Sequence, residues 1–308
     1  MATLVYTHSD FFGHMTPPGH PEQVARLGAV ERGLAGLAVE RREAPLAEES
    51  EVLRCHPAGY LARVKAEVPV EGWGQLDGDT YLAPRSLVAA LRGVGGCAAA
   101  VDAVLRGEAK NAFVAGRPPG HHAETAKAMG FCLFGNVAIA AKRALDRHGL
   151  ARVAIVDFDV HHGNGTQDLL WDEARCLFAS THQMPLYPGS GAESERGAHG
   201  QIVNVPLRAG SGSAVMRAAY EARVFPALEA FGPELILISA GFDAHADDPL
   251  AGLEWEADDY AWLTGRLCDI ADAHAGGRIV STLEGGYDLQ ALEACVAAHV
   301  GVLEERGR

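Results

Sequence analysis

Residues 152–166 read RVAIVDFDVHHGNGT, a run of apolar residues that passes directly into a cluster of acids and histidines. The uninterrupted run VAIV is typical of a parallel strand that helices cover on both faces. If the extended backbone continues beyond it, alternation puts Asp157, Asp159 and His161 on one side of the strand. The stretch therefore predicts an α/β protein with functional residues at the end of a buried strand.

The rest of the chain repeats this alternation of short apolar segments and longer helical patterns. The expected strands are Leu4–Tyr6, Ala112–Ala115, Arg152–Asp157, Cys176–Ser180, Ile202–Val205, Leu235–Ser239 and Arg278–Thr282. The expected helices are Pro84–Leu105, Asn136–His148, Ala214–Phe231, Glu256–Ala273 and Leu289–Glu304. The βαβα order predicts a mostly parallel sheet with helices on both faces. Glycine-containing segments at 189–200 and 210–212 are interpreted as loops, so residues 1–308 are expected to form a single domain.

Composition narrows the class of protein. The 308 residues are 48% hydrophobic and 21% charged, as in a globular chain with a large core. Lys and Arg number 26 against 40 Asp and Glu, a net charge of −14, which argues against a nucleic-acid partner. Six cysteines without a C-x-x-C pair, no signal-peptide pattern and no apolar run of membrane-spanning length predict a cytoplasmic protein without a membrane partner.

Polar residues follow four of the expected strands, in RPPGHHA, DFDVHHGNGT, SAGFDAHADDP and LEGGY. Carboxyl ends of parallel strands are where α/β proteins build their sites. Burying carboxylates beside an imidazole is costly unless they are paired or bind a metal. Two Asp and one His, with Asp243 from another strand end, suit a catalytic zinc site with an open fourth position. The alternative is a surface turn rich in Asp and His. The apolar run VAIV directly before these residues disfavours it, because such a run predicts a buried strand.

Such a site needs help from other residues. Two carboxylates neutralise a divalent zinc, so a second electrophile and a base are required. His121 and His122, in a Pro-Pro-Gly loop, and Tyr287, after Glu284-Gly285-Gly286, are the candidates. A flexible diglycine would let Tyr287 swing toward a developing oxyanion. An ordinary half-buried tyrosine and loop-stabilising histidines are the alternatives.

Taken together, RPPGHHA, GFCLFGNVAIAA, DFDVHHGNGT, SAGFDAHADDPLAG and LEGGY resemble the zinc-dependent histone deacetylase family. The resemblance is closest to its class II branch and to bacterial histone-deacetylase-like amidohydrolases and acetoin-utilisation-type deacetylases. It runs from Tyr6 to Tyr287 in the family's order. It implies the arginase/deacetylase fold and one catalytic domain over residues 1–308.

The resemblance also implies roles at matching positions. The implied metal ligands are Asp159, His161 and Asp243, which suit Zn²⁺ and also Fe²⁺. The implied catalytic residues are His121, His122, Tyr287, Asp157 as partner of His121, and Asn164 as partner of His122. The other main branch has an aspartate in place of Asn164. A neutral partner leaves His122 free to act as general base beside a charged His121. The histidine that protonates the leaving amine stays open.

Further positions match the family's substrate and ion sites. The implied channel residues are Gly130, Phe131, Tyr187 and Leu250, and Arg26 matches an arginine near the acetate exit. A structural K⁺ site is implied at Asp157, Asp159, His161, Ser180 and Thr181.

The implied activity is hydrolysis of linear, non-peptide C–N amides of acylated amines by a metal-activated water, with a histidine base and a tyrosine oxyanion donor. Acetyl-lysine is the first expected substrate, because Leu250 stands where acetylpolyamine-selective relatives often carry an acid. Asp77, Asp79 and Glu22 are other acids that could serve at the mouth, so an acetylpolyamine amidohydrolase is the alternative. Acyl-chain length and oligomeric state stay open.

Two distant alternatives share the fold. A binuclear manganese ureohydrolase would use the D-A-H-x-D pattern of Asp243, His245 and Asp247, but would leave Tyr287 and the P-G-H-H loop unexplained. An acyl-lysine-binding pseudoenzyme would lack a ligand, the base or the tyrosine, and each of these is present.

Overall fold

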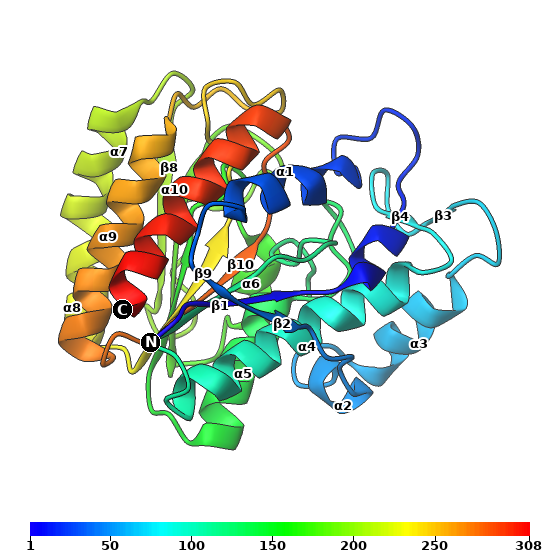
Figure 1. Ribbon diagram of the computed structural model, residues 1–308, viewed down its shortest axis with the longest axis horizontal. Coiled ribbons are helices and arrows are strands. Elements are labelled where there is room, and N and C mark those ends of the chain that lie inside the picture. The colour runs from blue at the N-terminus through cyan, green and yellow to red at the C-terminus, as the bar shows by residue number, and fades with distance from the viewer.

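The computed structural model describes residues 1–308 and contains one large parallel sheet (Figure 1). Its eight strands lie in the order β2-β1-β5-β10-β9-β6-β7-β8, and every neighbouring pair is parallel. The strands are β1 (Leu4–Thr7), β2 (Glu40–Glu43), β5 (Asn111–Val114), β6 (Val153–Asp157), β7 (Cys176–Gln183), β8 (Ile202–Leu207), β9 (Leu235–Ala240) and β10 (Ile279–Leu283). The short strands β3 (Gly74–Gln75) and β4 (Tyr81–Leu82) form a separate antiparallel pair. The prediction of an α/β fold with a mostly parallel sheet is confirmed.

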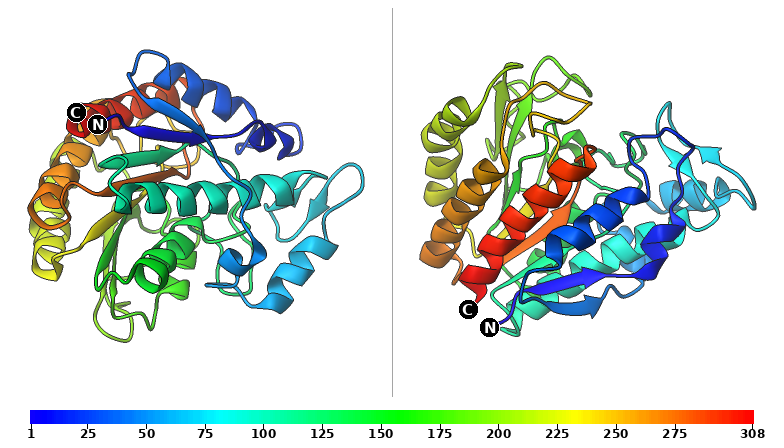
Figure 2. Two further views of the ribbon diagram at one scale, coloured as in Figure 1. Left: turned by 60° about the horizontal axis from the view of Figure 1, so that its bottom comes forward. Right: turned by 45° about the horizontal axis from the view of Figure 1, so that its top comes forward.

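Helices cover both faces of this sheet (Figure 2). One face carries α1 (Ala25–Leu34), α7 (Ser213–Ala219), α8 (Phe225–Phe231), α9 (Ala257–His274) and α10 (Leu289–Gly307). The other carries α4 (Ser86–Leu105) and α5 (Asn136–His148). The short helices α2 (Glu49–Val52), α3 (Ala58–Ala66) and α6 (Asn164–Leu169) lie outside these two layers. The two termini meet, because the amino group of Met1 donates to the carbonyl oxygen of Gly307 at 2.6 Å.

Strand β6 explains why the sheet is buried on both sides. Val153 and Ile155 pack into the core beneath α4 and α5, whereas Ala154 and Val156 pack into the core beneath the other helix layer. All four side chains are fully buried. Each branched side chain buried in this way contributes about 1.5–3 kcal/mol, which makes a continuous apolar run the expected pattern for a doubly covered strand.

The predicted strands and helices all exist, and their ends differ from the prediction by at most three residues, with none at Asn136–His148. The predicted helix 214–231 is α7 and α8 joined by a π-helical turn at Tyr220–Val224. The elements that prediction missed are β2, the β3–β4 pair, the 3-10 helix Ser9–Gly13 and the helices α1, α2, α3 and α6. Strand β2 reads ERRE and pairs with β1 at the sheet edge, where no apolar pattern marks it. Helix α1 contains two glycines, which weaken its helical pattern.

The expectation that no segment reaches membrane-spanning length is wrong for α4. This 20-residue helix is long and apolar enough to cross a membrane, although it contains Arg92 and Asp102. In the fold, 72% of its most apolar window is buried, since the helix packs over the sheet and against α5. Its composition therefore matches that of a core helix.

Candidate active site

The four motif-bearing loops follow β5, β10, β9 and β6, and these strands are consecutive neighbours in the sheet. Their carboxyl ends therefore open onto one place at the sheet edge. The sequence placed the motifs at strand ends, and the strand order brings those ends together.

The proposed ligands Asp159, His161 and Asp243 come together there. Their donor atoms all lie within 4.8 Å of one another, and all three residues are buried. His161 Nδ1 is 3.1 Å from Asp159 Oδ1 and 3.1 Å from Asp243 Oδ2. The expectation that the strand continues beyond Asp157 is wrong, because β6 ends there, although Asp159 and His161 still lie together while Phe158 and Val160 pack into the core. The chain turns instead, with the N–H groups of Asp159 and His161 donating to the carboxylates of Asp157 and Asp159.

The donor set and its surroundings fit a divalent cation. A Cβ atom at Gly241 would collide with the Asp159 carboxylate, and one at Gly285 would collide with the carboxylates of both aspartates. Burial disfavours an imidazolium at His161, yet its hydrogen bonds to Asp159 and Asp243 raise its pKa to about 10. Burial and the charge of Asp159 raise the pKa of Asp243. Two adjacent buried carboxylates thus require a positive charge beside them, which a proton on His161 or a bound metal supplies.

The tandem histidines differ in their partners. The Nδ1–H of His121 donates to Asp157 Oδ2 at 3.0 Å, and the Nδ1–H of His122 donates to Asn164 Oδ1 at 2.7 Å. The Asn164 amide also donates to Glu124 Oε1 at 2.8 Å, which orients its oxygen toward His122. His122 therefore keeps Nε2 free to accept a proton.

The pKa values of His121 and His122 shift in opposite directions, although their ring centroids are only 3.9 Å apart. Burial lowers the pKa of His121, but the charges of Asp159 and Asp157 outweigh it and hold the pKa well above its usual value. Burial, followed by the positive charges of His121 and His161, holds the pKa of His122 well below its usual value. A charged His121 beside a neutral His122 follows, and a neutral imidazole is the form that can act as a base.

The backbone of the segment that carries Tyr287 is hydrogen-bonded to side chains from other parts of the chain. Gly285 N–H donates to Asp159 Oδ2 at 2.8 Å, and Tyr287 N–H donates to Asp248 Oδ2 at 2.7 Å. Arg26 donates to the carbonyl oxygen of Gly286 at 2.7 Å. These three hydrogen bonds restrain the backbone on both sides of Gly286, and the swing of Tyr287 expected from the diglycine stays a prediction.

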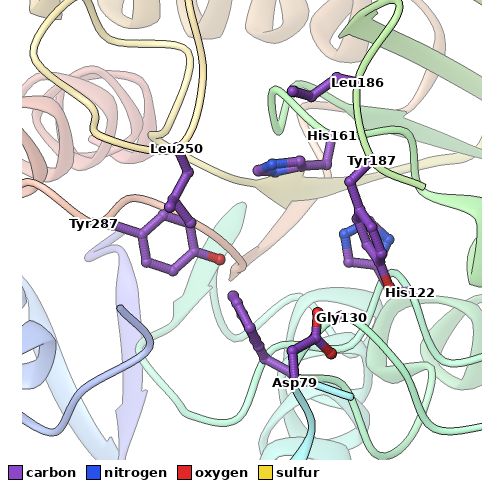
Figure 3. A pocket seen from close by; sticks show the side chains of 9 residues that line it. Asp79, His122, Gly130, His161, Leu186, Tyr187, Leu250 and Tyr287 are labelled. Carbon is purple, nitrogen blue, oxygen red and sulfur yellow. The ribbon is translucent and has the colours of Figure 1, made fainter. Parts of the chain in front are cut away.

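Tyr287 points its hydroxyl into the site. Figure 3 shows this hydroxyl directed into the cavity, across from His122 and Tyr187. Burial, followed by the charge of Asp243, holds the pKa of Tyr287 well above its usual value. The neutral hydroxyl is therefore available as a hydrogen-bond donor.

A cavity of about 240 Å³ leads to these groups. Its lining residues are Asp79, His122, Gly130, Phe131, His161, Leu186, Tyr187, Leu250 and Tyr287 (Figure 3). All four predicted channel residues are among them. Phe131 adopts a φ of 68°, a left-handed conformation that is costly for an aromatic residue and typical of functional sites. This conformation puts the Phe131 ring 5.9 Å from that of Tyr287, centroid to centroid.

Arg26 lies behind Tyr287 in a buried ion network. It donates to the carbonyl oxygen of Glu284 at 2.6 Å and to Glu22 Oε1 at 3.0 Å. Arg117 donates to Glu22 Oε2 at 2.6 Å. Glu22 is fully buried between these two cations, so its suggested place at the mouth is wrong. Of the three suggested acids, Asp79 lines the cavity.

Of the residues suggested for K⁺, Asp159 and His161 also belong to the proposed metal cluster, whereas Ser180 and Thr181 lie on β7, the strand next to β6. Ser180 is the strand neighbour of Asp157, and its Oγ lies 2.9 Å from His182 Nδ1. The Thr181 hydroxyl lies 2.7 Å from that of Tyr220, in the π-helical turn. Both side chains are buried polar groups with partners.

Sequence reasoning gave no role to Glu284 and Asp248. Glu284 Oε2 accepts the N–H groups of Gly120 at 2.6 Å and His121 at 3.1 Å, which ties the histidine loop to the end of β10. Its position directly after a buried strand is the same feature that singled out Asp157. Asp248 lies in an irregular loop, where no sequence pattern marks it.

Comparisons with known proteins agree with this geometry. The Histone deacetylase domain family matches residues 20–303. The "Histone deacetylase-like amidohydrolase" of Pseudomonas aeruginosa is 43% identical over 306 residues, covering 95% of this chain and 79% of that protein. The "Probable deacetylase" of Archaeoglobus fulgidus is 37% identical over 299 residues, covering 94% and 82%. Among solved structures, the HDA15 HD domain matches with a TM-score of 0.91 at 34% identity, covering 98% of this chain and 90% of that one.

Proposed function

The chain belongs to the histone deacetylase family, and on that premise we propose that it is a zinc-dependent hydrolase of linear N-acyl amines, with acetyl-lysine as its first substrate. One observation carries the proposal. His161 of the Asp159–His161–Asp243 cluster, the neutral His122 and Tyr287 line one cavity of about 240 Å³.

The residues of the chain divide the chemistry among them. Asp159, His161 and Asp243 would hold a divalent metal, which when bound would supply Lewis-acid chemistry toward the acyl carbonyl and water. His122 Nε2 accepts the proton of the attacking water, and the neutral Tyr287 hydroxyl donates to the developing oxyanion. His121, charged through Asp157, stabilises negative charge and keeps His122 neutral. Zinc is the metal we propose, and Fe²⁺ suits the same donors.

The walls of the cavity support an extended, slim acylated side chain. Tyr187 lies 5.2 Å from His122, ring centroid to ring centroid, and Phe131 also lines the cavity. Flat aromatic faces favour methylene groups over branched ones. Gly130 lines the cavity, and its carbonyl oxygen, which accepts from the Cys132 thiol at 3.2 Å, is the proposed acceptor of the substrate amide hydrogen.

A second candidate substrate class is supported by Asp79. It is the only acidic residue that lines the cavity, and no Lys or Arg lines it. Tyr187, at the mouth, has its pKa raised by burial and then by the charges of Asp79 and Asp77. An acidic mouth attracts a substrate with a second cationic group, as in an acetylpolyamine. Leu250 beside it supports the acetyl-lysine reading.

The distant alternatives have less support. A ureohydrolase needs Asp247 as a further metal ligand, yet 76% of the Asp247 side chain is exposed to solvent. A pseudoenzyme would leave the base or the oxyanion donor missing, whereas His122 and Tyr287 line the cavity. We also propose the structural K⁺ site and a cytoplasmic location, which the sequence suggested.

Acetate release from a matched panel tests the proposal. The panel is an acetyl-lysine peptide, N-acetylputrescine and N-acetylcadaverine, each with and without chelator. We expect chelator-sensitive release, with Tyr287→Phe and His122→Ala strongly impaired and Asp247→Asn unchanged. A preference for the diamines would select the polyamine class. No release from any of the three by the zinc-loaded protein would refute the amide hydrolase.

A further inference from the structure

Asp248 is a buried carboxylate that has no part in the proposed chemistry. It lies in the loop after β9 and is 6% exposed. Its Oδ2 accepts the N–H groups of Tyr287 at 2.7 Å and Asp288 at 3.4 Å, and its Oδ1 accepts the N–H of Leu250 at 3.0 Å. All of its hydrogen-bond donors are backbone amides, and no Lys or Arg pairs with it. A buried carboxylate without a cation is costly unless its position serves a purpose.

The backbone next to Tyr287 shows why a clamp is needed. Gly286 precedes it with a φ of 115°, a conformation open to glycine but to few other residues. The peptide between Gly286 and Tyr287 is fixed on one side by Arg26, which binds its carbonyl oxygen, and on the other by Asp248, which binds its N–H. An oxyanion donor displaced by even half an ångström loses much of its effect.

Asp248 is itself well anchored. Its own N–H donates to the carbonyl oxygen of His245 at 3.0 Å, two residues beyond the metal ligand Asp243. The carboxylate therefore connects the loop after β9 to the backbone of Tyr287. The same carboxylate holds Leu250, which lines the mouth of the cavity.

We infer that Asp248 is a positioning residue that presets the Tyr287 hydroxyl for the oxyanion and ties it to the Leu250 rim. The inference rests on the proposed function, because Tyr287 matters to turnover only if the site hydrolyses an amide. The expected consequence is that Asp248 contributes to turnover through Tyr287 and not independently of it.

Asp248→Asn is the variant to test, with Asp247→Asn as matched control. Asparagine has the same shape, but its NH₂ faces a backbone N–H and so removes one accepted hydrogen bond. Hydrogen exchange of the peptide spanning residues 284–290 is measured first. We expect faster exchange in Asp248→Asn and unchanged exchange in Asp247→Asn, whose side chain is 76% exposed.

The kinetic test is a double-mutant cycle with Tyr287→Phe. We expect Asp248→Asn to lower kcat about tenfold or more in the wild-type background, and less than about twofold in the Tyr287→Phe background, because groups that act as one unit are not additive. Zinc content is measured for every variant and is expected to be unchanged.

Each outcome decides a different question. Equal losses in the two backgrounds, or unchanged exchange at 284–290, would overturn the role of Asp248. If Asp248→Asn does not fold, Asp248→Glu, which keeps the charge but moves it, enters the same cycle and must show the same non-additivity. A wild-type protein without acetate release would refute the proposed function alone, and the exchange measurement would still decide whether Asp248 holds Tyr287.

Discussion

Replacing Asn164 by aspartate tests how this site sets the charge of its base. Asn164 Oδ1 lies 2.7 Å from His122 Nδ1, and the pKa of His122 is held well below its usual value. A carboxylate at that position, at an effective separation of about 4 Å and an effective dielectric constant of about 20, favours the imidazolium by about 4 kcal/mol. That corresponds to a rise of about 3 pKa units, the upper end of measured shifts next to an opposite charge.

Glu124 complicates the single substitution. Its carboxylate accepts a hydrogen bond from the Asn164 amide at 2.8 Å, so an aspartate there would face a second carboxylate. Two carboxylates this close share one proton at neutral pH, and the net charge next to His122 then changes little. We therefore expect Asn164→Asp alone to shift the pKa by less than about 1 unit, and Asn164→Asp with Glu124→Gln to shift it by about 2–3 units.

The assay is the pH profile of kcat/KM for acetate release from an acetyl-lysine peptide between about pH 5 and 9, the range in which histidine titrates. A base works only above its pKa, so a raised pKa moves the acidic limb of the profile to higher pH. Activity should fall about tenfold for each pH unit below the new limb. Glu124→Gln alone is the control and should leave the limb in place. An acidic limb that stays at the wild-type position in the double variant would refute the assignment of His122 as the base.

Three further predictions concern stability, metal and specificity. Glu22→Gln leaves two buried arginines without their anion and should lower the free energy of urea unfolding at pH 7 by about 3–5 kcal/mol. Because the pKa of Glu22 is depressed in the folded protein, the difference in unfolding free energy between wild type and variant should narrow by about 1.4 kcal/mol per pH unit below about pH 4.5. A difference that does not change with pH would contradict the argument. Zinc must displace the proton that His161 holds with a pKa of about 10. The zinc affinity, measured by competition with a chelator, should therefore rise about tenfold per pH unit between about pH 7 and 9. An affinity that does not change with pH would show that zinc binding displaces no proton from His161. Asp79→Asn should lower kcat/KM for N-acetylputrescine about two- to fivefold and leave an uncharged acetyl-amine unchanged, because a partly exposed charge pair contributes about 1 kcal/mol or less; equal effects on both substrates would argue against a charge contact.

The sequence was sufficient to predict the sheet and most of the site because both depend on local patterns. VAIV identifies a doubly covered strand through its own side chains. Asp159, His161, His122 and Tyr287 each follow such a strand, and the parallel order of the strands brings them together. The neutral partner Asn164 predicted that the two histidines would differ, and the opposite pKa directions of His121 and His122 agree with that reasoning.

Other features depend on contacts between residues far apart in the chain. Strand β2 is polar and exists because β1 offers it an edge. Glu22 appeared free to reach the mouth until the fold enclosed it between Arg26 and Arg117, the latter 95 residues away in the chain. The diglycine before Tyr287 suggests mobility when read alone, and only the fold shows which groups hold it.

The buried carboxylates of the site share one design that explains this rigidity. Each accepts at least one backbone N–H, which fixes a loop, while most also present an oxygen to a histidine or to the proposed metal. The carboxylates and the amides they hold are Asp157 with Asp159, Asp159 with His161 and Gly285, Asp243 with Val160, Glu284 with Gly120 and His121, and Asp248 with Tyr287 and Leu250.

Because the same carboxylates carry the charge of the site and hold its loops in place, a substitution that removes one of them changes both the charge and the shape of the site. An alanine at any of these positions removes a charge and releases a loop at once, so its effect on turnover cannot be assigned to either cause. The isosteric amide keeps the side-chain shape and one acceptor oxygen, and it separates the two where a single oxygen accepts the backbone N–H groups, as in Asp243 and Glu284. The site is preorganised by the same groups that make it reactive, and substitutions that preserve shape are the ones that will reveal which function each carboxylate serves.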